Sequence, residues 1–312
     1  MKFRNFTIVL LCMIFLLPAC AKKDDAILRM GYLQSDLHHL PAFVALEKGY
    51  FAGQGLKVEV GGVFKAGPEE MSAFGAGELD FGYVGQAPAT AALLNGVADI
   101  QFIAQVNLEG SAIVARKGTE AASLKNLTGK TVAFPGYATM QDFLLRRALK
   151  NTGMTIQNIR PIVLKPPEMQ QALELKHIDA FIAWQPYPAQ ALSSGSAQVV
   201  LDSSAIWKDH PCCVLIARRE IAQSRPEDMR RLRAAHAQAC AFIEQNPDEA
   251  IAIGIKYTSM DRVVVQEALS RICFEDQLDR QKSREFVDFL IENKYIKKFE
   301  NARERFAGAF FD

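Results

Sequence analysis

One segment of the sequence occurs twice, at a constant offset of 99 residues (172 minus 73). Residues 73–88 (AFGAGELDFGYVGQAP) and 172–187 (ALELKHIDAFIAWQPY) align without a gap. The pattern of each copy predicts the end of a helix, a turn that contains an aspartate, and a buried strand followed by a glutamine. The matched residues include Ala73 with Ala172, Asp80 with Asp179, and Gln86 with Gln185. Two similar lobes of βαβ build explain this repeat.

The segments around the repeat predict an α/β architecture, because apolar runs of strand length alternate with helical periodicity. The two lobes are expected to cover roughly residues 27–114 and 118–209, and the chain is almost wholly helical from Ile221 onward. The expected strands are 27–33, 56–63, 79–85, 100–106, 130–136, 159–165 and 178–184. The expected helices between them are 41–49, 68–77, 88–96, 139–153 and 167–176.

The first 19 residues are predicted to be an export signal rather than part of the fold. A positively charged start precedes an apolar core at residues 6–17. That core is shorter than the roughly 20 apolar residues of a membrane span. Residues 17–20 (LPAC) resemble a bacterial lipobox, and residues 20–26 suit a short tether. We therefore expect lipidation of Cys20, with an ordinary secretory signal as the alternative.

The charge of the chain gives no electrostatic case for nucleic-acid binding. Loss of Lys2 and Arg4 with the signal lowers the 36 basic residues to 34, against 35 acidic residues. About 290 remaining residues can bury a sizeable core. The cysteines beyond Cys20 are Cys212, Cys213, Cys240 and Cys273. Their spacing fits no zinc motif and adjacent cysteines are poor disulfide partners, so we expect neither a metal nor a cofactor, and we interpret the adjacent pair as buried small residues.

Four loops are expected to meet at one edge of the sheets. Ligands of open α/β sheets bind beyond the carboxyl ends of the strands. The loops at that edge are 34–39, 85–88, 136–140 and 184–187, two from each lobe. A ligand cleft between the lobes follows from this placement.

Two of the five histidines, His38 and His39, lie side by side in the first loop. They could donate hydrogen bonds to a ligand, cap the helix that begins at Pro41, bind a metal or act in catalysis. No third histidine or cysteine lies at ligand spacing, and no nucleophile or paired carboxylate accompanies them in the four loops. We therefore predict that one imidazole faces the cleft, that the other packs or is solvated, and that the site contains no catalytic residue.

The other candidate ligand-binding residues are small, amide or aromatic. Gly136, Tyr137 and Thr139 form a turn before a helix, where exposed amides can bind an anion or simply begin the helix. Trp184 and Gln185 offer an aromatic wall and an amide, although the tryptophan could equally be core. The remaining candidates are Gln34, Ser35, Gly85, Gln86, Asn107 and Ser111. Since the four loops contain no lysine or arginine, a dianion bound by a bidentate arginine is not expected.

Several segments together resemble the ABC-transporter substrate-binding proteins of the nitrate/sulfonate/taurine and thiamine-precursor family. They are HHLPAFVALEKGYFAGQGLKVEV (38–60), AFGAGELDFGYVGQAPA (73–89), LTGKTVAFPG (127–136), IDAFIAWQPYP (178–188) and HPCCVLIARREI (210–221). The resemblance implies the two-lobed periplasmic binding protein fold of type 2. It places two hinge crossings at residues 112–118 and 212–220, so that lobe 2 is residues 115–212 and residues 213–312 return to lobe 1.

The resemblance also implies a function. The chain is expected to be an exported, monomeric binding protein, lipid-anchored outside the cytoplasmic membrane, that delivers a small organic molecule to a permease and its ATPase. A sulfonate-like monoanion or a thiamine-precursor-like heterocycle would suit the four loops. The alternatives are an enzyme on this fold related to thiamine pyrimidine synthesis and a sensing receptor without transport.

Substitution of Cys20 tests the predicted anchor. Cys20→Ser should leave unprocessed or soluble protein, because no other residue can accept the lipid. Partition into detergent measures this, with Cys273→Ser as the control that should partition like the wild type. A Cys20→Ser protein that still enters detergent like the wild type would contradict the prediction.

Overall fold

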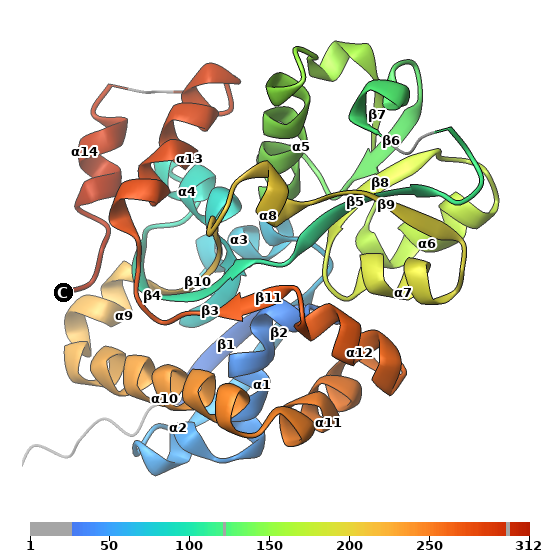
Figure 1. Cartoon of the computed structure of the whole chain (residues 1–312). Coiled ribbons are helices and arrows are strands. Elements are labelled where there is room, and N and C mark those ends of the chain that lie inside the picture. The colour runs from blue at the N-terminus through green and yellow to red at the C-terminus, as the bar shows by residue number, and fades with distance from the viewer. Residues whose placement is uncertain (1–26, 121–122, 298–299) are drawn as a thin grey trace, which may run out of the picture.

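The computed structural model of the chain describes residues 27–120, 123–297 and 300–312. The predicted export signal and Cys20 lie outside these residues. Figure 1 shows two α/β lobes, each built around one sheet, which confirms the predicted fold class. Within the described residues, no helix is both long and apolar enough to cross a membrane.

The sheet of lobe 1 has six strands in the spatial order β11, β4, β10, β3, β1, β2. β1 runs parallel to β2 and β3, whereas β10 lies antiparallel between β3 and β4. The bounds are β1 (Leu28–Leu33), β2 (Val58–Phe64), β3 (Phe81–Gly85), β4 (Ile100–Glu109), β10 (Pro211–Arg218) and β11 (Ile272–Phe274). The inner strands β3 and β10 are almost continuously apolar, because helices cover both faces of the sheet.

The sheet of lobe 2 repeats this topology with five strands in the order β7, β6, β8, β5, β9. β6 runs parallel to β7 and β8, and β5 lies antiparallel between β8 and β9. The bounds are β5 (Ser111–Arg116), β6 (Thr131–Phe134), β7 (Arg160–Val163), β8 (Ala180–Trp184) and β9 (Ala197–Asp202). The order β2, β1, β3, β10, β4 therefore matches β7, β6, β8, β5, β9 strand for strand, which is the physical basis of the repeat in the sequence.

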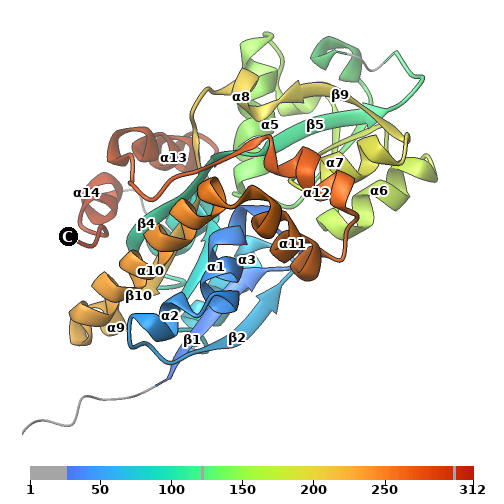
Figure 2. The same cartoon turned by 60° about the horizontal axis from the view of Figure 1, so that its bottom comes forward.

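Helices pack on both sheets, and those of the C-terminal part also link the lobes. α10 and α11 pack against α1, whereas α12 packs against α7 of lobe 2 (Figure 2). The helices up to the second crossing are α1 (Leu40–Glu47), α2 (Tyr50–Gly53), α3 (Gly67–Gly75), α4 (Gln86–Asn95), α5 (Met140–Asn151), α6 (Pro166–Glu174), α7 (Tyr187–Ser193) and α8 (Ser203–Ile206). Those after it are α9 (Arg219–Ser224), α10 (Pro226–Gln245), α11 (Pro247–Thr258), α12 (Arg262–Leu269), α13 (Arg280–Glu292) and α14 (Ala302–Ala307). Short 3-10 turns occur at η1 (Leu37–His39), η2 (Leu124–Leu127) and η3 (Ile156–Asn158).

The chain passes between the sheets at two adjacent points. The first crossing is Gly110, between β4 and β5, and the second is residues 207–210, between α8 and β10. The two are bonded to each other, since the main-chain N–H of Glu109 donates to the carbonyl of His210 at 3.0 Å. Both crossings differ in position from the expected ones. Residues 112–118 include β5, which lies in the sheet of lobe 2, and residues 212–220 include most of β10, which lies in the sheet of lobe 1.

Asp80, one of the repeated aspartates, joins three strands of lobe 1. Its carboxylate accepts hydrogen bonds from the Arg29 main-chain N–H (2.9 Å) and from the Arg29 and Arg218 guanidinium groups. Arg29 belongs to β1 and Arg218 ends β10, so this one side chain, next to the start of β3, connects all three strands. Burial alone would raise the pKa of Asp80, but these hydrogen bonds and positive charges together lower it.

Asp179 has the corresponding place in lobe 2. Its carboxylate accepts from the main-chain N–H of Thr131 at 2.8 Å and from the Arg116 guanidinium at 3.1 Å. Thr131 begins β6 and Arg116 ends β5, the counterparts of β1 and β10. The aspartate is therefore needed in both copies because the turn before each inner strand must satisfy the same free main-chain donor.

Replacement of Asp80 should destabilise the protein in a pH-dependent way. Asp80→Asn should lower the free energy of unfolding by about 2 to 4 kcal/mol near pH 7, because it removes charge-assisted hydrogen bonds from a buried carboxylate. A carboxylate with a lowered pKa contributes stability above its unfolded pKa and loses it as the pH falls. The difference from wild type should therefore shrink below about pH 4.

Urea denaturation followed by circular dichroism measures this effect. Asp99→Asn is the control, because Asp99 pairs with Arg219 but its side chain is 61% exposed. This variant should change the free energy of unfolding by no more than about 1 kcal/mol. Equal losses for the two variants, or a loss in Asp80→Asn that stays constant with pH, would refute the role given to Asp80.

Candidate functional site

The loop that carries the two histidines turns sharply after β1. Ser35 has a positive φ of 52°, and Asp36 then accepts a hydrogen bond from the His38 main-chain N–H at 2.9 Å. This cap begins the 3-10 turn η1, which leads into α1 with Pro41 in its first turn. Asp36 is thereby buried together with both imidazoles.

His39 is a structural residue within lobe 1. Its Nδ1 accepts the Leu33 main-chain N–H at 3.1 Å, so Nε2 carries the hydrogen of the neutral ring. The ring packs near Tyr83 with centroids 6.0 Å apart, and Nε2 lies 3.8 Å from the Asp36 carboxylate. Burial lowers the pKa of His39 well below its usual value. His39 therefore fixes the end of β1.

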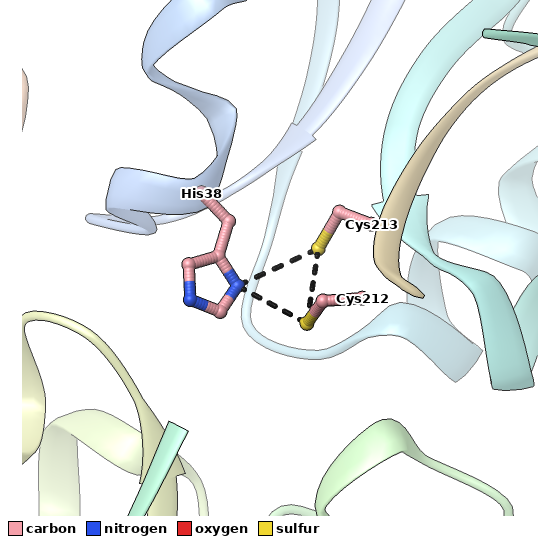
Figure 3. A group of neighbouring side chains, drawn as sticks. All are labelled: His38, Cys212 and Cys213. Atoms are coloured by element: carbon pink, nitrogen blue, oxygen red, sulfur yellow. Dashed lines mark hydrogen bonds between the residues drawn. The ribbon is translucent and has the colours of Figure 1, made fainter. Parts of the chain in front are cut away.

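His38 faces two cysteines from the start of β10 (Figure 3). Its Nδ1 lies 3.4 Å from Cys212 Sγ and 3.6 Å from Cys213 Sγ, and the two sulfur atoms are 4.0 Å apart. Its Nε2 lies 2.8 Å from the Gly110 carbonyl oxygen, to which it donates. The imidazole thus connects the loop after β1 with both strands at the crossings.

Gly110 must be a glycine at this position. Its φ is +85°, a left-handed conformation that favours glycine. A Cβ added there would also lie 2.3 Å from His38 Nε2. The first crossing therefore passes directly against the imidazole, and any larger residue would displace it.

The charges of this cluster depend on one another. Burial alone would lower the pKa of His38, but Cys212 and Asp36 raise it to about 9. Burial alone would raise the pKa of the Cys212 thiol, but the hydrogen bond from Cys213 and the charge of His38 hold it well below its usual range. Burial raises the pKa of Asp36 to about 7. On its own the cluster favours a Cys212 thiolate beside a protonated His38, a pair that can act as a nucleophile or bind a soft cation.

A small cavity of about 20 Å³ lies beside this cluster, between the lobes. That space holds about one water molecule or one ion. Lobe 2 contributes Trp184 and the start of α5, where Thr139 accepts the Asp142 main-chain N–H. The cavity is lined by Leu33, Asp36, His38, Gly67, Gly85, Pro88, Thr139, Met140, Gln141, Trp184, Cys212 and Cys213.

Four of the predicted ligand-binding residues line this cavity, namely His38, Gly85, Thr139 and Trp184. His39 points into lobe 1 instead, which answers which imidazole faces the cleft. Gln34 and Tyr137 are exposed, Ser35 is half-buried, and Gly136 lies in the turn before α5. Both histidines are fully buried, so they belong to the packed interior rather than to a solvated helix start.

The repeated glutamines Gln86 and Gln185 are fully buried next to the cavity walls. Gln185 Oε1 accepts the Ala189 main-chain N–H at 3.2 Å, which fixes the start of α7. Its Nε2 has no hydrogen-bond partner among the described residues, and neither polar atom of the Gln86 side chain has one. Buried amides without partners are costly, which marks them as candidates to bind a ligand.

Asn107 and Ser111, two of the predicted ligand-binding residues, lie on either side of the first crossing. Asn107 Oδ1 accepts the Cys213 main-chain N–H at 3.1 Å, and its Nδ2 donates to the carbonyl of Glu109 at 3.1 Å. Ser111 Oγ accepts from Gln141 Nε2 of α5 at 3.0 Å. These side chains therefore connect the strands and the helix that surround the cavity.

The cavity-lining residues that sequence reasoning missed come mainly from outside the four loops. Cys212 and Cys213 lie 174 and 175 residues from His38. No spacing motif could join them, and the only signal was two adjacent cysteines beside an expected hinge crossing. Gln141 follows directly after the predicted loop 136–140, one residue beyond the limit we set.

The lobes touch across the cavity. The Leu37 main-chain N–H donates to the Gln185 carbonyl at 3.2 Å, and the Tyr187 hydroxyl donates to the Gln34 carbonyl at 3.1 Å. An ion pair joins Lys165 of lobe 2 to Glu69 of lobe 1. An organic ligand can therefore enter only after the lobes move apart.

Three larger hollows lie elsewhere on the described surface. The smallest of them, of about 240 Å³, lies at the first crossing, and its buried polar side chains, Ser111 and Ser203, both belong to lobe 2. Of the other two, one of about 790 Å³ lies among α10, α11, α12 and β11, and one of about 650 Å³ lies between α5 and α13. None of the three gathers several buried polar groups from both lobes. We therefore assign the functional site to the small cavity at the crossings, despite its size.

Comparisons with known proteins concern the family and the fold of the chain. The sequence profile described as the NMT1-like family matches residues 21–255. A protein of Brucella abortus (strain 2308) described as a binding protein is 32% identical over 84% of this chain and 81% of its own length. A protein of Bacillus subtilis (strain 168) described as an aliphatic sulfonates-binding protein is 27% identical over 93% of this chain and 91% of its own length.

A solved structure gives the same picture of the fold. The alkanesulfonate-binding protein SsuA from Xanthomonas axonopodis pv. citri, bound to MOPS, superposes with a TM-score of 0.81. The alignment covers 91% of this chain and 98% of that chain at 20% identity. At this identity, the likeness establishes the fold.

The structural role of His39 can be tested through its effect on the stability of the protein. His39→Ala should lower the free energy of unfolding by about 2 to 4 kcal/mol, because it leaves a cavity and an unpaired Leu33 N–H in lobe 1. The exposed His177 provides the control, and His177→Ala should change the value by less than about 0.5 kcal/mol. Urea denaturation of the unliganded proteins measures both. A His39→Ala protein as stable as His177→Ala would show that the Leu33 contact contributes nothing.

Proposed function

We propose, since this chain belongs to the NMT1-like family, that it is the solute-binding component of an ABC importer. The observation that carries the proposal is the cavity at the two crossings, which residues of both lobes line. A ligand held there bridges the lobes and stabilises them in contact. The relatives described as binding proteins, including one for aliphatic sulfonates, support this function.

The solute that best suits the lining of this cavity, once the lobes move apart to make room for it, is a small organic monoanion. α4 and α5 both begin at its wall, where main-chain N–H groups and the helix dipole attract negative charge. Gln86 and Gln185 add free amide groups, and Trp184 gives a flat apolar wall. The lining contains no lysine or arginine, so a dianion would lack a charge partner. A sulfonate-like group fits these features better than a thiamine-precursor-like heterocycle, which is the second candidate.

Release and uptake require movement at the crossings. The chain passes between the lobes only at Gly110 and residues 207–210 among the described residues, so these are the hinge points. Contacts such as the Tyr187 to Gln34 hydrogen bond would break as the lobes part. The lobe boundaries would then be residues 27–110 with 207–312 for lobe 1, and 111–206 for lobe 2.

The setting of the protein in the cell completes the proposal. We expect export, lipidation at Cys20, a monomer at the outer face of the cytoplasmic membrane, and a permease with an ATPase as partners. A sensing receptor would have the same structure. An enzyme on this fold is the third candidate, because the Cys212 thiolate beside His38 could attack an electrophile. The neighbouring genes separate these candidates, since a permease and an ATPase indicate an importer.

Gln86→Leu tests the place of the ligand without loss of a structural contact. If the Gln86 amide binds the solute, loss of this hydrogen bond should weaken affinity by about 5- to 150-fold, which corresponds to about 1 to 3 kcal/mol. The unliganded protein should remain at least as stable, because an unsatisfied buried amide is removed.

The measurement is isothermal titration with a panel of short alkanesulfonates, after mass spectrometry of small molecules released from the purified protein. Gln171→Leu on the exposed face of α6 is the control and should bind like the wild type. Wild-type affinity in Gln86→Leu would remove this residue from the site. The absence of binding to any sulfonate would count against the proposed solute class.

A further inference from the structure

Two sulfur atoms and one imidazole nitrogen meet at a spacing that fits a metal ion. A tetrahedral zinc ion bonds sulfur at about 2.3 Å and nitrogen at about 2.0 to 2.1 Å, which places nitrogen and sulfur about 3.6 Å apart and two sulfurs about 3.8 Å apart. His38 Nδ1 lies 3.4 and 3.6 Å from the Sγ atoms of Cys212 and Cys213, which are themselves 4.0 Å apart. All three distances agree with zinc coordination to within about 0.2 Å.

The strand that carries the cysteines is distorted to bring both sulfurs together. Successive side chains of a regular strand point to opposite faces. The pairing of β10 with β4 shifts register on both sides of Cys213, and the Cys213 main-chain N–H donates to Asn107 Oδ1 at 3.1 Å. Bulges of this kind redirect side chains next to functional sites. Here the irregularity turns both thiols toward His38, as Figure 3 shows.

The imidazole is also held as metal-ligating histidines are. Such residues usually donate the hydrogen of their second ring nitrogen to a carboxylate or a main-chain carbonyl, which orients the first nitrogen. His38 Nε2 donates to the Gly110 carbonyl at 2.8 Å, and Gly110 has no side chain to interfere. The Nδ1 lone pair of the neutral ring therefore points at the two sulfurs.

The surroundings suit a single ion. The adjacent cavity of about 20 Å³ has room for one atom-sized ligand. Two thiolates balance the charge of a divalent ion, so the buried centre avoids the cost of an isolated charge. The Asp36 carboxylate lies 3.7 Å from His38 Nδ1 and offers an oxygen donor for a fourth position. Adjacent cysteines form only a strained disulfide, so the pair can remain reduced outside the cytoplasm.

We propose that His38, Cys212 and Cys213 bind one zinc ion, with the fourth position facing Asp36 and the cavity. The spacing, the bulge in β10 and the orientation of His38 carry this inference. This inference goes beyond the proposed function. Zinc binding can be measured without any solute and without the transporter, so the two proposals can be tested separately. The proposed site differs from the sequence prediction of no metal, which relied on ligand spacing along the chain.

Cobalt titration of the full-length wild-type protein tests the site. The protein is stripped with a chelator under reducing conditions and titrated with Co²⁺, a spectroscopic substitute for Zn²⁺. One equivalent should produce a sulfur-to-cobalt charge-transfer band and the intense visible bands of tetrahedral coordination. One equivalent of Zn²⁺ should then remove these bands. Saturation without a sulfur band would overturn the proposal.

Substitutions assign the ligands. Cys212→Ser, Cys213→Ser and His38→Gln should each weaken Zn²⁺ binding by more than about 100-fold, since loss even of an outer-shell partner costs 10- to 100-fold. Cys240→Ser and Cys273→Ser are matched controls, because both thiols lie outside the cavity lining. They should bind zinc like the wild type. Zinc affinity that is lost in Cys273→Ser but kept in Cys212→Ser would place the metal elsewhere and overturn the proposal.

If the variants fail to fold, a measurement on the wild-type protein can still test the zinc site. Alkylation of the protein, followed by mass spectrometry of its peptides, reports which thiols are free. Because Cys212 and Cys213 are buried, the chelator-treated protein is refolded with or without one equivalent of Zn²⁺ and then labelled in mild denaturant, which opens the site to the reagent. The ion should protect Cys212 and Cys213 and leave Cys273 reactive. Equal labelling of the adjacent pair in both samples would overturn the proposal.

Discussion

The double passage of the chain between the two sheets is the constraint on which the rest of this structure depends. Each sheet receives its antiparallel inner strand from the far side of a crossing, β5 in lobe 2 and β10 in lobe 1. The crossings lie against each other through the Glu109 to His210 hydrogen bond. Polar side chains are found at this point because strands and loops of both lobes end there, and their main-chain N–H and C=O groups need hydrogen-bond partners. Gly110 and Asn107 lie at or near the first crossing and contact groups of the candidate site, the His38 imidazole and the Cys213 main chain.

The fold could be predicted from the sequence because its two halves repeat one physical solution. Asp80 and Asp179 each satisfy a free donor at the start of a neighbouring strand and an arginine at the end of the antiparallel one. A pattern with such a cause persists in the sequence even where the rest has diverged. The positions of the crossings could not be read in the same way. Only Gly110 separates β4 from β5, so no loop marks where the chain leaves one sheet for the other.

The site was predictable only in part. The histidine pair pointed to a loop that lines the cavity, and His38, Gly85, Thr139 and Trp184 lie at the cavity. Cys212 and Cys213 escaped because their relation to His38 is made by the fold, across more than half the chain, and because a bulge changes the direction of one side chain. The two imidazoles also make different contacts, although the residues are adjacent in the sequence. His39 is held by a main-chain donor within lobe 1, whereas His38 reaches the crossings.

The placement of β10 in the sheet of lobe 1 also affects the order in which the two sheets form. The sheet of lobe 2 is made from the continuous segment 111–202, whereas the sheet of lobe 1 needs β10 and β11, which end at residue 274. β10 pairs with both β3 and β4 and lies between them. During synthesis, which starts at the N-terminus, β10 is made about one hundred residues after β4, so the edges of β3 and β4 stay unpaired until then. Their open edges can pair with other chains during that interval, a hazard that lobe 2 does not share. Lobe 1 is the first to be synthesised and its sheet is the last to close.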